Sequence, residues 1–386
     1  MRNDASATLP GSPDPWAPSD MPRLRARPPY FMSEMIAAEP ALAERLVRRL
    51  ARADEVAALA TALRAAADAR RSIITTGCGT SEHAAMAVAR ILDEVLRLPT
   101  GREVRTTQAL DLIDSPPPEG VVIGISHEGG TWATNQALRA ARAAGAVTAV
   151  IAVSRQSPAA DLVDHVVETS EADQSWCHTV GYLSPLLAGT VLASILARRR
   201  SDAIALRAML EAATDPRAAS ATAAALRDCA RVLVVGAGID EASARELALK
   251  IEEGARLAAV AHHVETVRHG HLASADTTTG LVLILSDTHL GSSVVDRALA
   301  VLRSAAELGL PAAAILGTRA AEALPRRFTP AGRMAIPRGS RTAAVAAAAL
   351  GAAIPLQLLA ERLARARGVN PDTLGREDPA QAAAHA

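Results

Sequence analysis

Residues 121–138 read VVIGISHEGGTWATNQAL, and the order of residue types in this stretch points to one kind of fold. An apolar run from Val121 to Ile125 ends at Ser126, and two glycines and Thr131 then lead into a segment with helical periodicity. A strand, a glycine-rich turn and a helix in this order are typical of a parallel sheet whose turns present anions to helix N-termini. Glu128 is unexpected in such a turn, because a carboxylate repels an anionic ligand.

The same alternation continues through the first half of the chain. Apolar runs predict further strands at 71–77, 147–154 and 165–169, and helical periods separate them. The uncharged stretch 179–197 closes this unit. Alternating strands and helices predict an α/β fold, a parallel sheet with helices on both faces.

A second copy of this unit follows the first. The strand at 232–238 ends in GAG, as the strand at 73–79 ends in GCG. Corresponding positions are separated by nearly constant distances: Gly77 and Gly236 by 159 residues, Ser126 and Ser286 by 160, and Thr179 and Thr342 by 163. The spacing therefore predicts an internal duplication with two tandem, doubly wound parallel-sheet domains.

The domains can be delimited from composition and pattern. We expect the first at 41–200, opening with a helical segment at about 41–69, and the second at 216–368. Residues 1–28 are rich in Pro, Asp and Arg and lack the apolar stretch of a signal peptide, so they predict a disordered leader. Residues 369–386 form a C-terminal tail.

Composition excludes several classes of partner. The 386 residues carry 41 basic and 41 acidic side chains, without a basic block, which argues against a nucleic-acid partner. Two uncharged stretches, 179–197 and 342–360, approach the length of a membrane span, but both are Ala-rich and interrupted by Gly, Pro, Ser or Thr. We interpret them as buried helices, and expect no membrane partner. Three isolated cysteines, Cys78, Cys177 and Cys229, fit a reducing, cytoplasmic setting.

Two cofactor hypotheses are weak. The turns GCGTSE and GAGIDE lack the third glycine of a dinucleotide fingerprint, since Glu82 and Glu241 stand there. Four histidines fall within 262–271, but their spacing matches no standard zinc motif. The sequence predicts neither a metal nor a cofactor.

A family resemblance rests on six segments in a fixed order. They are MSEMIAAEP (32–40), TTGCGTSEHAA (75–85), GISHEGGT (124–131), ELALKIEEG (246–254), VETVRHGH (264–271) and RGVNPD (367–372). The combination resembles proteins with two sugar isomerase (SIS) domains, which include the isomerase half of glucosamine-6-phosphate synthase and phosphosugar isomerases and deaminases. The resemblance implies a homodimer acting on a small sugar or sugar phosphate.

The resemblance assigns a binding site and two catalytic residues. Hydroxyl and backbone N–H groups in the two glycine turns would hold the sugar phosphate, at Thr80, Ser81, Ser126, His127, Glu128 and Thr131. Glu253 resembles the base that moves a proton between C1 and C2, with Lys250 beside it in the binding site. His269 resembles the residue that opens the sugar ring, contributed by the neighbouring subunit.

The residues themselves allow a simpler interpretation of the Glu253 segment. At 100° per residue, Leu247, Ile251 and Gly254 form the inward stripe of a helix. Lys250 borders that stripe, so Glu246, Lys250 and Glu253 could equally form an ion ladder on the surface.

Several features depart from the family pattern. Glu128 replaces a serine of the phosphate loop, His271 replaces a proline after His269, and no lysine follows Lys250, so the Schiff-base lysine of the synthase is missing. No glutaminase domain is recognisable, so glutamine-derived ammonia is not expected. The sequence leaves open an isomerase, an amino-sugar-6-phosphate deaminase, a non-catalytic sugar sensor and an isomerase of an unphosphorylated sugar.

Glu128 has two possible orientations. If it points away, the Gly129–Gly130 backbone and Thr131 still bind phosphate, with His127 supplying positive charge. If it faces the ligand, the ligand presents an amine or hydroxyl groups there instead of a phosphate.

Overall fold

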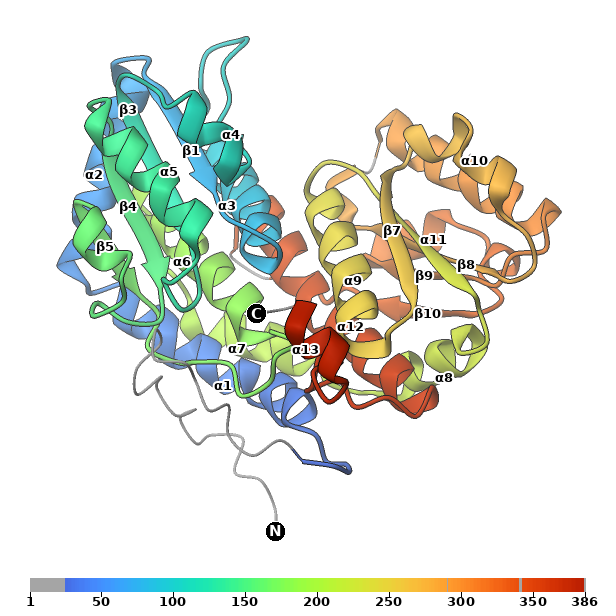
Figure 1. The fold of residues 1–386 in the computed structure, drawn as a ribbon. Coiled ribbons are helices and arrows are strands. Elements are labelled where there is room, and N and C mark those ends of the chain that lie inside the picture. The colour runs from blue at the N-terminus through green and yellow to red at the C-terminus, as the bar shows by residue number, and fades with distance from the viewer. Residues whose placement is uncertain (1–24, 290, 340–341, 385–386) are drawn as a thin grey trace.

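The computed structural model describes residues 25–289, 291–339 and 342–384, and has two α/β lobes side by side (Figure 1). Five parallel strands form the first sheet in the order β2-β1-β3-β4-β5. Their bounds are β1 Ser72–Thr76, β2 Arg105–Thr106, β3 Gly120–Ile125, β4 Val147–Ala152 and β5 His165–Glu168. Residues 1–24 of the expected leader lie outside the described part of the chain.

The second sheet repeats the first. Its parallel strands lie in the order β10-β9-β8-β6-β7, which is the order of the first sheet once each strand is matched to its counterpart. Their bounds are β6 Arg231–Gly236, β7 Ala258–His263, β8 Thr279–Leu285, β9 Ala312–Leu316 and β10 Gly332–Ala335. The prediction of two tandem parallel-sheet domains is confirmed.

Helices cover both faces of each sheet. Around the first sheet these are α2 Asp54–Asp68, α3 Thr80–Leu96, α4 Ala109–Asp114, α5 Trp132–Ala143 and α6 Val180–Leu196, and α7 Ala203–Glu211 packs on the N-terminal helix and on the last long helix of the second domain. Around the second they are α8 Arg217–Leu226, α9 Ile239–Ala255, α10 Ser293–Glu307, α11 Thr318–Ala323 and α12 Ala344–Ala366. The outer face of each sheet has its own hydrophobic cluster, whereas one continuous cluster joins the inner faces through α3, α6, α9 and α12. The two domains therefore share a core.

The N-terminal helical segment starts earlier than the sequence indicates. Helix α1 spans Phe31–Leu50 and continues through Pro40. The Asp372 carboxylate accepts hydrogen bonds from the N–H groups of Phe31 and Met32 at 2.8 and 2.9 Å. This cap comes from a residue at the other end of the chain, so no local signal marks the start of the helix.

Helix α12 is the one described helix that is long and apolar enough to cross a membrane. In the structure 83% of its most apolar stretch is buried inside the protein. It packs against α9 and α8, the position of a core helix.

Candidate functional site

The first glycine turn joins β1 to α3. Gly79 precedes the helix with φ 58°, in the left-handed region, and a Cβ at Gly77 would lie 2.7 Å from the backbone of Ser81. Both glycines are thus required by the tight turn. The turn leaves Thr80 mostly buried and Ser81 half-buried at the N-terminus of α3.

The second glycine turn joins β3 to α5 and lies beside the first. Strands β1 and β3 are adjacent and parallel, with Thr76 opposite Gly124. Ser126 is buried, and its hydroxyl donates to the Thr131 hydroxyl at 3.4 Å, while Gly130 and Thr131 are exposed. The structure therefore brings Thr80, Ser81, Ser126 and Thr131 to one sheet edge, at the strand-order switch where open α/β sheets bind ligands.

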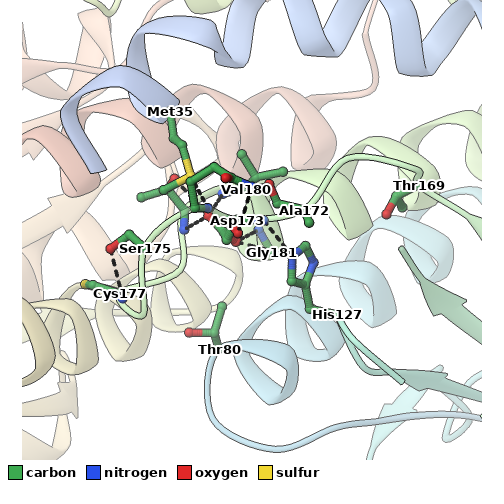
Figure 2. Close-up of polar contacts among 12 residues, drawn as sticks. Met35, Thr80, His127, Thr169, Ala172, Asp173, Ser175, Cys177, Val180 and Gly181 are labelled. Carbon is green, nitrogen blue, oxygen red and sulfur yellow. Dashed lines mark hydrogen bonds and ion pairs between the residues drawn. The ribbon is translucent and has the colours of Figure 1, made fainter. Parts of the chain in front are cut away.

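His127 turns away from solvent toward a loop that precedes α6. Its ring accepts a hydrogen bond at Nε2 from the backbone N–H of Asp173 at 3.0 Å (Figure 2). Burial lowers the pKa of His127 to about 4, against the opposing influence of the Asp173 carboxylate. The expectation that His127 supplies positive charge is therefore wrong, because a neutral imidazole is the stable form at neutral pH.

Asp173 is a structural partner that the sequence did not indicate. Its carboxylate accepts the N–H groups of Thr179, Val180 and Gly181 at 2.9, 3.1 and 2.6 Å, at the start of α6 (Figure 2). The closing helix of the first domain thus begins on a buried carboxylate, which its free N–H groups and dipole favour.

Glu128 is partly buried beside the same loop. Burial raises the pKa of Glu128, as does the nearby Asp173 carboxylate, whereas His178 and Arg376 act in the opposite direction. Arg376, in the C-terminal tail, stacks over the Trp176 ring, with its guanidinium carbon 3.5 Å from the ring centroid. The charged neighbours of Glu128 therefore come from this loop and from the tail.

The predicted surface ion ladder on α9 is instead buried between the domains. Glu246 and Lys250 are 0% exposed, and the Glu253 side chain is 20% exposed. Lys250 pairs with Glu253 and lies 3.7 Å from Glu246. The surface interpretation is wrong because α9 packs on its own sheet and also on α3 and α12.

This buried cluster is connected to the first glycine turn. The Thr80 hydroxyl donates to Glu246 Oε1 at 3.3 Å, and His83 Nδ1 lies 2.8 Å from Glu246 Oε2. A continuous polar path thus runs from the start of α3 through Glu246 and Lys250 to the partly exposed carboxylate of Glu253.

The only lysine of the chain is held as a cation. Burial alone would lower the pKa of Lys250, but the negative charges of Glu253 and Glu246 outweigh burial and raise it above its ordinary value. A protonated amine cannot attack a carbonyl, so Lys250 is unsuited to form a Schiff base. Burial also raises the pKa of the adjacent Cys177 thiol well above its usual range, so this cysteine is not an activated nucleophile.

His269 lies apart from this cluster, on the surface of the second domain. It follows a short 3-10 turn, Thr266–Arg268, and its Nε2 lies 2.9 Å from Glu265 Oε1. The His269 side chain is 70% exposed, and the rings of His262 and His271 lie near one another with centroids 4.0 Å apart. Within the described residues, no group of three or more His, Cys, Asp or Glu side chains is arranged to hold a metal ion.

The family of the chain follows from comparison with known proteins. The model of the SIS domain family matches residues 67–199 and 225–319, more than half of the chain. The chain therefore belongs to the SIS domain family, whose domain occurs here twice.

Individual relatives agree with this assignment. The chain is 26% identical over 230 residues to a glutamine–fructose-6-phosphate aminotransferase of Gloeobacter violaceus, over 55% of this chain and 37% of that protein. The chain thus spans little more than a third of that relative's length.

Two solved structures share the fold. The C-terminal domain of glucosamine-fructose-6-phosphate aminotransferase from Francisella tularensis has a TM-score of 0.76 and 19% identity, over 89% of this chain and 98% of that one. Tagatose-6-phosphate ketose/aldose isomerase from Escherichia coli has a TM-score of 0.67 and 20% identity, over 92% and 98%.

Proposed function

We propose that this protein is an aldose–ketose isomerase or an amino-sugar-6-phosphate deaminase, with Glu253 as the base. One observation carries the proposal: Glu253 is the partly exposed end of a buried ion cluster that reaches the N-terminus of α3. The lysine beside Glu253 is fully buried and paired, so its proposed part in the site is to orient the carboxylate rather than to react.

The proton transfer needs few groups. The Glu253 carboxylate removes the C2 proton of the open-chain aldose, which leaves an enediolate, and returns that proton to C1 to give the ketose. For a 2-amino sugar the same transfer gives an imine at C2, and water hydrolyses it to the ketose and ammonia. Neither route requires a lysine nucleophile.

The phosphate end of the sugar is proposed to bind at the two glycine turns. The residues Thr80, Ser81, Ser126 and Thr131 lie in these turns, next to the N–H groups at the start of α3 and α5, and such donors suit a phosphate dianion. His127 contributes as a neutral, buried group that shapes the second turn.

Ring opening is assigned to His269 of a second copy of the chain. The exposed imidazole with Glu265 beside it is accessible to a partner, and a homodimer would bring it to the Glu253 of its neighbour. The free thiols of Cys78, Cys177 and Cys229 support a cytoplasmic location for this dimer.

The decisive test is exchange of the C2 proton of glucosamine 6-phosphate and of the C1 proton of fructose 6-phosphate with solvent deuterium, followed by NMR. Glu253→Gln should lower exchange by about a hundredfold or more, the usual contribution of a positioned base. Glu252→Gln is the matched control, because Glu252 is the exposed neighbour on the same helix and should leave exchange unchanged. If the wild type binds these sugar phosphates but exchanges neither proton, the proposal of an enzyme is contradicted and a sugar sensor is favoured.

Glu128→Ser tests whether the sugar is phosphorylated. Since His178 and Arg376 neighbour the Glu128 charge, we propose that it points away from the ligand, and fructose 6-phosphate should bind this variant with unchanged affinity in a calorimetric titration. Clearly tighter binding would show that the carboxylate faces the phosphate. Preference of the wild type for fructose over fructose 6-phosphate would place the substrate among unphosphorylated sugars.

A further inference from the structure

The second domain has a cavity of about 410 Å³ at the carboxyl edge of its sheet. Its walls come from the segments that follow β8, β9 and β10 and from the first turns of α12. Ligand pockets of small molecules begin at about 300 Å³, so a sugar phosphate fits this volume. None of the residues assigned above to the isomerase site lines the cavity.

Two unpaired cations line this cavity. Arg319 and Arg338 are both exposed, and within the described part of the chain neither guanidinium forms an ion pair with a carboxylate. They come from different segments, Arg319 from the start of α11 and Arg338 from the stretch after β10. Two planar guanidinium groups at one cavity suit the several oxygens of a phosphate monoester.

Hydroxyl groups form the floor of the same cavity. Ser286 is buried, donates its hydroxyl to Asp240 Oδ2 at 3.0 Å and lies 2.7 Å from the Thr288 hydroxyl. Because the single Ser286 proton goes to Asp240, Thr288 donates to Ser286, and its oxygen remains free to accept from a sugar hydroxyl.

The acidic residue of the cavity is already engaged. Asp287 Oδ1 accepts the N–H groups of Arg319 and Ala320 at 3.0 Å each, at the start of α11. Its charge is partly offset by these donors, and the two guanidinium groups leave the cavity with a net positive charge.

In the first domain the segment after β3 makes contacts within the protein. There the segment after β3 places His127 against Asp173, and Asp173 holds the start of α6. The segment after β8 instead contributes Ser286, Asp287 and Thr288 to the cavity.

We propose that this cavity is a second ligand site, for a hydroxyl-bearing phosphate monoester such as a hexose phosphate, with Arg319 and Arg338 on the phosphate and Thr288 on a sugar hydroxyl. The site is separate from the isomerase site and does not depend on it.

Arginine labelling with phenylglyoxal, analysed by peptide mass spectrometry, tests the site directly. Fructose 6-phosphate at about ten times its dissociation constant should slow labelling of Arg319 and Arg338 roughly tenfold, since only the unoccupied fraction reacts. Fructose should give no protection. The exposed Arg102 and Arg105 lie in the first domain, at or just before its edge strand β2. They should react with phenylglyoxal at an unchanged rate.

Two variants separate this site from the isomerase site. Arg319→Ala/Arg338→Ala should remove one of two binding events in a calorimetric titration with fructose 6-phosphate and leave deuterium exchange at the isomerase site unchanged. Arg303→Ala, an exposed arginine on α10, should keep both binding events. Absence of protection in the wild type, loss of protection in a Ser81→Asp variant of the first domain, or loss of deuterium exchange in the double arginine variant would overturn the proposal. Absence of deuterium exchange in the wild type, with protection of Arg319 and Arg338 retained, would count only against the isomerase.

Discussion

The two domains share one turn geometry and fill it in opposite ways. Gly79 and Gly238 have nearly the same backbone, φ 58° and ψ −128° against φ 55° and ψ −122°, and each begins a long helix. In the first domain the helix then starts with the hydroxyls of Thr80 and Ser81. In the second domain Ile239 and Asp240 take their places, and Asp240 is 1% exposed.

Asp240, at the start of α9 just after the turn that follows β6, binds groups of its own domain. Its Oδ2 accepts the backbone N–H and the hydroxyl of Ser286 at 2.7 and 3.0 Å, and lies 3.3 Å from His289 Nε2. The second domain thus supplies its own anion where the first offers donors and an exposed Gly130–Thr131 turn. Of these two matching turns, the one between β6 and α9 is therefore closed by its own carboxylate, whereas the cavity lined by Arg319 and Arg338 lies farther along the same edge, beyond β8.

The largest expected effect concerns the ion cluster that ties the first turn to α9. Lys250→Met leaves the buried Glu246 and the adjacent Glu253 without their shared cation, and removal of one partner from a buried pair costs about 3–5 kcal/mol. Urea unfolding should show this loss. Arg245→Met, which breaks an exposed pair with Glu241 on the same helix, should cost less than about 1 kcal/mol. Equal losses in the two variants would mean that Lys250 is solvated.

The burial of this cluster could not be inferred from helical periodicity. The sequence correctly indicated Leu247, Ile251 and Gly254 as inward, and all three are buried. A single stripe, however, describes a helix with one packed face, whereas α9 is covered by its own sheet and by α3 from the other domain. Domain packing of this kind leaves no periodic signal in one segment.

The duplication was predictable and the partner of His127 was not. Constant spacing between matching glycines and serines sufficed to predict two sheets, because strand length and turn chemistry are local. His127 contacts Asp173, 46 residues later in the chain, and neither that loop nor the cap on α6 has a recognisable motif. The charge of His127 depends on this long-range burial, so it required the structure.

The next effect concerns His127, after β3, and His289, after β8, whose contributions to the free energy of unfolding depend on pH in opposite ways. Burial lowers the pKa of His127 from 6.5 to about 4, so the unfolded chain binds a proton that the folded chain rejects, and stability falls as pH drops between these values. From pH 7 to pH 5 this costs roughly 2 kcal/mol. The hydrogen bond to Asp240 raises the pKa of His289 despite burial, so its contribution is present below its unfolded pKa and is lost as pH rises through the folded pKa.

Urea unfolding at pH 7 and pH 5 separates the two contributions. His127→Gln keeps an acceptor for the Asp173 N–H and should lose less stability on acidification than the wild type. His289→Gln should lose more stability than the wild type on the same change. The same pH response in both variants would show that the two histidines share one protonation state.

The smallest effect is expected when the turn between β1 and α3 receives the acidic residue of the turn between β6 and α9. Ser81→Asp places a carboxylate where Asp240 stands in the second domain, at a helix N-terminus that tolerates acidic residues, so the fold should be retained. A carboxylate about 4 Å from a phosphate costs about 1 kcal/mol per charge pair even in water, which predicts a loss of fructose 6-phosphate affinity of about fivefold or more by calorimetry. Ser81→Asn has the same shape without the charge and should bind more tightly than Ser81→Asp. If both variants bind fructose 6-phosphate with the same affinity, the phosphate does not lie at the turn between β1 and α3. That turn and the turn between β6 and α9 would then differ in shape, but neither would bind the phosphate.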